Sequence, residues 1–80
     1  MTYAEAKAIH LQNLAALGWT VKPNLKVPHA TSRDGQVRLW FKPQAVWASY
    51  GVGHELGNAR SIFVDTKTAN TQQIITAARR

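Results

Sequence analysis

The hydrophobic period of this chain changes at Gly18, and that change constrains the fold more than any other feature. Before it, Thr2 and Glu5 match the capping box Ser/Thr-x-x-Glu, and strong helix formers follow. From Trp19 onward, apolar residues tend to alternate with polar ones, which is the period of a strand. Glycine readily adopts the left-handed conformation that ends a helix. The sequence therefore predicts a helix over about residues 3–17, followed directly by β-structure.

Four later segments are rich in strand-forming residues. They cover residues 19–31, 36–42, 45–50 and 59–65. Pro23 and Pro28 each remove a backbone donor from the first segment, so it should be an edge strand or only partly paired. Asn70 and Gln73 then form an N-cap pair for a short last helix. We therefore predict one α+β domain over residues 1–80: a helix, a three- to four-stranded antiparallel β-meander and a short C-terminal helix, with both helices on one face of the sheet.

The register of the hairpin at Arg33-Asp34-Gly35 decides which side chains share a face, because a slip of one residue exchanges the two faces of a strand. A two-residue loop would pair Ala30 with Leu39 and Thr31 with Arg38. A three-residue loop, with Gly35 left-handed, would pair Thr31 with Val37, His29 with Leu39 and Val27 with Phe41. We favour the three-residue loop because it places five large apolar residues on one face: Leu25, Val27, Val37, Leu39 and Phe41.

That register leaves a basic face on the same two strands, made of Lys26, Pro28, Ala30, Arg38, Trp40 and Lys42. An indole on a strand can stack on a nucleobase while lysine and arginine contact phosphates. The chain carries 10 Lys+Arg against 4 Asp+Glu, a formal net charge of +6, which favours a polyanionic partner. We therefore expect a module that binds DNA or RNA through Lys26, Arg38, Trp40 and Lys42, supported by Lys22 and Arg60. The alternative is that Trp40 packs beneath a helix or loop.

The sequence has no arrangement typical of an enzyme, a metal site or a cofactor site. Cysteine is absent, which excludes disulfides and thiolate zinc sites. His54 and Glu55 begin an incomplete His-Glu-x-x-His motif, because Asn58 stands where the second histidine belongs. Lys7 and His10 border the apolar stripe of the first helix, where such side chains usually reach solvent. We expect a protein that is not an enzyme and needs no metal or cofactor.

Targeting features are also absent from the sequence. No run approaches the length of about 18 apolar residues typical of a membrane span, and the first residues lack the basic start of a signal peptide. We therefore expect a cytoplasmic protein without a membrane partner.

Three segments of the chain resemble small uncharacterised proteins of bacteriophage and prophage genomes. They cover residues 25–31, 37–46 and 53–61. The resemblance implies a small accessory protein made inside a bacterial cell that acts on nucleic acid or on a host factor. In the second case the protein would bind and modulate a host protein, or would form a small oligomer such as a homodimer. Trp40, Trp47 and Tyr50 would then be the interface anchors.

Overall fold

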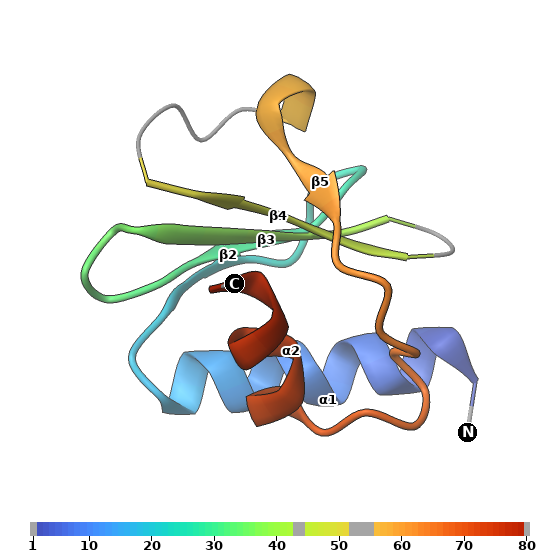
Figure 1. Cartoon of the computed structure of the whole chain (residues 1–80). Helices are drawn as coiled ribbons and strands as arrows, with labels where there is room; N and C mark the ends of the chain where they lie inside the picture. The colour runs from blue at the N-terminus through green and yellow to red at the C-terminus, as the bar shows by residue number, and fades with distance from the viewer. Residues whose placement is uncertain (1, 43–44, 52–55, 80) are drawn as a thin grey trace.

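The computed structural model describes residues 2–42, 45–51 and 56–79, which form two helices packed on one face of an antiparallel sheet (Figure 1). The elements are α1 (Tyr3–Ala16), β1 (Thr20–Lys22), β2 (His29–Thr31), β3 (Val37–Phe41), β4 (Val46–Tyr50), the 3-10 helix η1 (Leu56–Asn58), β5 (Arg60–Ser61) and α2 (Thr71–Ala78). The sheet order is β1-β2-β3-β4-β5, and all neighbouring strands are antiparallel. The predicted α+β fold is confirmed. No helix of the described residues is both long and apolar enough to cross a bilayer.

Local sequence signals set the ends of both helices. The Thr2 hydroxyl accepts from the Glu5 backbone N–H and the Glu5 carboxylate accepts from the Thr2 N–H, each over 3.1 Å. Asn70 and Gln73 cap α2 in the same reciprocal way, with both bonds at 2.8 Å. At the end of α1, Gly18 has φ of 91°, and the N–H of Trp19 donates to the carbonyl of Leu14 over 3.0 Å. This bond is that of a Schellman motif, so the predicted helix end is confirmed.

The first strand-forming segment folds into two strands instead of one. β1 and β2 pair with each other, placing Val21 opposite Ala30 and Lys22 opposite His29. The chain reverses over residues 23–28, which Pro23 and Pro28 bracket. Proline cannot donate to a strand ladder, so the reversal falls where regular pairing is already interrupted. The sheet consequently has five strands.

The register that we predicted for the hairpin between β2 and β3 is wrong by one residue. The observed pairs are His29 with Trp40, Ala30 with Leu39, and Thr31 with Arg38. Instead of Thr31, Ser32 lies opposite Val37: its N–H donates to the Val37 carbonyl over 2.8 Å, and its hydroxyl accepts from the Val37 N–H over 3.1 Å. The observed register is therefore the one that we derived for the two-residue loop, not for the three-residue loop that we favoured. Gly35 is nevertheless left-handed, as expected, with φ of 73°.

The corrected register changes the composition of the core. Ala30, which we expected on the basic face, is fully buried beneath the helices with Val37, Leu39 and Phe41. These strand residues pack in one cluster with Leu11, Leu14, Ile74 and Ala78, among others, from the two helices. Leu25, which we expected on the apolar face, is 51% exposed in the β1–β2 connection, and Val27 lies outside the cluster. The short strands β1 and β2 therefore supply less of the core than predicted.

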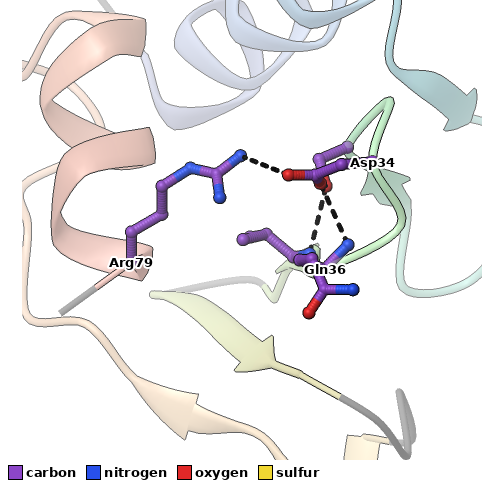
Figure 2. Close-up of polar contacts among 5 residues, drawn as sticks. Asp34, Gln36 and Arg79 are labelled. Carbon is purple, nitrogen blue, oxygen red and sulfur yellow. Dashed lines mark hydrogen bonds and ion pairs between the residues drawn. The ribbon is translucent and has the colours of Figure 1, made fainter.

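The tip of the hairpin is tied to the end of α2. Figure 2 shows the Arg79 guanidinium pointing at the Asp34 carboxylate, and the two groups lie 3.6 Å apart. The same carboxylate accepts from the Ser32 hydroxyl over 2.6 Å and from the Gln36 N–H over 3.0 Å. These hydrogen bonds, Ser32 first, together with the charge of Arg79, hold the pKa of Asp34 below its ordinary value. Asp34 thus stabilises the loop most strongly when it is ionised.

Acid should weaken the fold partly through Asp34. Because the pKa of Asp34 is lower in the folded chain than in the unfolded chain, its stabilising effect is fully present above the unfolded value of about 3.8 and is lost as the pH falls through the lower folded value. Asp34→Asn keeps an acceptor oxygen but does not ionise. The drop in Tm between about pH 6 and pH 3, measured by circular dichroism, should be smaller in this variant than in the parent protein. Equal drops in the two proteins would show that Asp34 does not contribute.

Candidate nucleic-acid interface

The face of the sheet that points away from α1 and α2 carries most of the predicted site. Strand alternation and register place ten described residues on this outer face: Thr20, Lys22, His29, Thr31, Arg38, Trp40, Lys42, Trp47, Ser49 and Ser61. One row crosses all five strands, because Lys22 lies opposite His29, His29 opposite Trp40, Trp40 opposite Trp47, and Trp47 opposite Ser61. The outer face is therefore a mixed surface of cationic, aromatic and hydroxyl side chains.

Four of the six predicted binding residues share this face. Arg38, Trp40 and Lys42 follow one another at alternate positions, and Lys22 joins them from the edge strand β1. Lys26, which we expected on the same strand face, is instead exposed in the β1–β2 connection. Arg60 points to the opposite side of the sheet: it pairs with the core residue Ala48, and its guanidinium donates to the Ala78 carbonyl over 3.5 Å.

Trp40 is buried, with 5% of its surface exposed, although it lies outside the main core cluster. The ring of His29 lies 6.4 Å from it at a tilt of 57°, and the guanidinium carbon of Arg38 lies 5.8 Å from its centre. η1, orange in Figure 1, also lies on this side of the sheet. A base would need an open ring face for stacking, which an indole this buried does not offer. The packed tryptophan of our alternative interpretation is therefore the observed one.

The cations of the outer face are held by neighbouring side chains. The Lys42 ammonium lies 4.2 Å from the centre of the Trp47 ring, within the range of a cation–π interaction. The Arg38 Nε donates to the Thr31 hydroxyl over 2.9 Å. Arg38 and Lys42 are both only partly buried. This arrangement restricts the conformations of two long side chains before any ligand arrives.

His29 adds a titratable group between these cations. Its Nδ1 is buried and has no hydrogen-bond partner among the described residues. Burial, and then the charges of Arg38 and Lys22, lower the pKa of His29 from its ordinary value. At pH 7 the outer face therefore carries a neutral imidazole beside positive Lys22, Arg38 and Lys42.

A groove of about 790 Å³ runs along the β5 edge, next to the outer face. Its lining consists of Trp47, Ala59, Arg60, Ser61, Ile62, Phe63 and Ala77. Phe63 is 93% exposed and has φ of 52°, a left-handed conformation that is uncommon for a residue with a side chain. We had predicted a strand through residue 65, but β5 ends at Ser61. The alternation of the sequence gives no signal for this exposed ring, since the backbone turn at Phe63 produces it.

Other sequence motifs contribute no further site to the described chain. His54 and Glu55 of the incomplete His-Glu-x-x-His motif lie outside the described residues. Within residues 2–42, 45–51 and 56–79, no group of three histidine, aspartate or glutamate residues is placed to hold a metal ion. Tyr50, one of the candidate interface anchors, is 55% exposed at the end of β4. Comparisons with protein-family models, curated proteins and solved structures found no match to this chain.

Proposed function

We propose that this chain is a non-enzymatic nucleic-acid-binding protein whose outer face contacts the phosphate backbone. The observation that carries the proposal is the charge of that face: Lys22, Arg38 and Lys42 project from it, and none of its ten described residues is acidic. The formal net charge of +6 would also attract a polyanion over a longer range. Exposed Lys26 extends the positive surface into the β1–β2 connection.

Binding through these residues should depend on salt and tolerate many sequences. Lysine and arginine that neutralise phosphates release condensed counterions, so affinity falls as the salt concentration rises. None of the ten described outer-face residues carries an amide or a carboxylate, the groups that read adenine and cytosine edges. In this proposal Trp40 acts indirectly, because its ring and the Thr31 hydroxyl position the Arg38 guanidinium.

Lys22→Ala and Lys67→Ala provide a matched test of the surface that binds. Both lysines are exposed, and each substitution removes one positive charge, but Lys67 lies in the turn before α2, away from the outer face. Affinity would be measured by fluorescence anisotropy with labelled oligonucleotides over a salt series. Lys22→Ala should reduce the slope of log K against log salt by about 1, whereas Lys67→Ala should leave the slope unchanged. Absence of wild-type binding at low salt would contradict the proposed function, and equal effects of the two variants would exclude the outer face.

A further inference from the structure

Two aromatic residues and several apolar residues line the groove at the β5 edge. The indole of Trp47 and the ring of Phe63 both line it, together with Ile62 and Ala77. Its volume of about 790 Å³ falls within the range of about 300–1,000 Å³ that is typical of sites for small organic groups. A flat aromatic ligand group could therefore contact aromatic and apolar side chains there.

Packing of the core does not explain the position of Phe63 in this groove. A ring that is 93% exposed adds almost nothing to the core, and its backbone has the uncommon φ of 52°. Such outliers are concentrated at sites of ligand contact. The position therefore directs a large flat surface into solvent, where a stacking partner can reach it.

The charges around the groove indicate an anionic ligand. Arg60 lines the groove, and the Lys42 ammonium lies 4.2 Å from the centre of the Trp47 ring. None of the described lining residues is acidic. A ligand that presents flat rings together with negative charge matches both properties of the groove, and a nucleotide unit of a nucleic acid has both.

The groove is also continuous with the outer face. Trp47 lies in the row of outer-face residues opposite Trp40, and it lines the groove as well. A nucleic-acid chain whose phosphates lie near Arg38 and Lys42 would therefore reach the groove within the width of two strands, about 10 Å. Bases in a duplex hide their faces in the stack, so only an unpaired base could stack on these aromatic side chains.

We propose that the β5-edge groove is a stacking site for unpaired bases of single-stranded nucleic acid, with Trp47 and Phe63 contacting the bases and Lys42, beside Trp47, contacting the adjoining phosphates. This inference rests on the proposed function, and it adds the substrate class: single strands in preference to duplexes. The sequence predicted that Trp40 would stack on bases; in this inference Trp47 and Phe63, which line the groove, have that role instead.

Phe63→Ala tests the stacking site without disturbing the core, since the ring is almost fully exposed. Leu17→Ala is the control, because Leu17 is a 51% exposed apolar residue beyond the end of α1. Affinities would be measured by anisotropy for a labelled single-stranded oligothymidine and for a DNA duplex of equal length. Phe63→Ala should weaken oligothymidine binding by about 5- to 150-fold and duplex binding by less than about twofold. Leu17→Ala should change neither affinity, and Phe63→Tyr, which retains the ring, should bind oligothymidine like the wild type.

Three outcomes would overturn the inference in distinguishable ways. If Phe63→Ala bound oligothymidine with the affinity of the wild type, the stacking site would be excluded and the proposed function would stand. If the wild-type protein bound neither oligonucleotide at low salt, both the stacking site and the proposed function would be excluded. A wild-type dimer in light scattering that Phe63→Ala converts to a monomer, with oligothymidine binding unchanged, would identify the groove as a contact between copies of the chain.

Discussion

Replacing Trp40 by alanine is expected to lower the free energy of unfolding by about 3–5 kcal/mol, the usual cost of truncating a large buried aromatic residue. Trp40 lies on the central strand β3 and is 5% exposed. The substitution would remove the surface against which His29 and the Arg38 guanidinium are positioned. The cavity left by the missing indole would therefore destabilise the outer side of the sheet, although Trp40 is outside the main core cluster.

Urea denaturation followed by circular dichroism would measure this effect. Tyr50→Ala is a suitable control because Tyr50 is also aromatic and lies on the neighbouring strand, but it is 55% exposed. Its truncation should cost clearly less than that of Trp40, about 1 kcal/mol. A Trp40→Ala variant as stable as the wild type would contradict the packing role of Trp40.

Replacing His10 by alanine is expected to cost about 2–5 kcal/mol, from lost hydrogen bonds and a carbonyl left buried without a partner. His10 is 5% exposed. Its Nε2 lies 2.9 Å from the Thr66 carbonyl, and its Nδ1 lies 2.8 Å from the Thr71 hydroxyl. Because a carbonyl can only accept, Nε2 donates to Thr66, and in the neutral imidazole with this tautomer Nδ1 accepts from the Thr71 hydroxyl. The imidazole therefore joins α1 to the first residue of α2 and to the turn before it.

Two further variants would separate the polar contribution of His10 from its packing. His10→Phe keeps a ring that can pack near Phe41, whose centre lies 6.5 Å from that of the imidazole, but it removes both hydrogen bonds. Chemical denaturation should show His10→Phe to be less stable than the wild type. Gln12→Ala, at an exposed position of the same helix, should change the stability by less than about 0.5 kcal/mol. A His10→Phe variant as stable as the wild type would show that the hydrogen bonds contribute nothing net.

The loss of free energy of unfolding expected for Trp40→Ala or His10→Ala would be a large part of the total stability. Folded domains are typically stable by about 0.05–0.15 kcal/mol per residue, which corresponds to about 4–12 kcal/mol for a chain of this length. Either truncation could therefore populate the unfolded state at 37 °C. For this reason, binding experiments on the outer face are better made with Lys22 and Phe63, whose exposed side chains contribute little to the core.

Helix ends and the fold class were predictable from the sequence because short-range interactions determine them. Thr2 with Glu5 and Asn70 with Gln73 are capping pairs three residues apart, and Gly18 supplies the left-handed end of α1. By contrast, periodicity places His10 at the border of an apolar stripe, where solvent is the usual partner. Its observed partners Thr66 and Thr71 are 56 and 61 residues away, so only packing of the two ends of the chain brings them to the imidazole.

The candidate site shows the same division between local and tertiary effects. Alternation alone correctly placed Arg38, Trp40 and Lys42 on one face, and the net charge of +6 indicated a polyanionic partner. The tertiary structure decided which aromatic rings are buried and which are exposed. The Ser32 side chain and backbone set the β2–β3 register, neighbouring groups bury Trp40, and the backbone turn at Phe63 exposes a ring beside Trp47. A register and a buried fraction depend on contacts between separate segments, which the local pattern of a sequence does not contain.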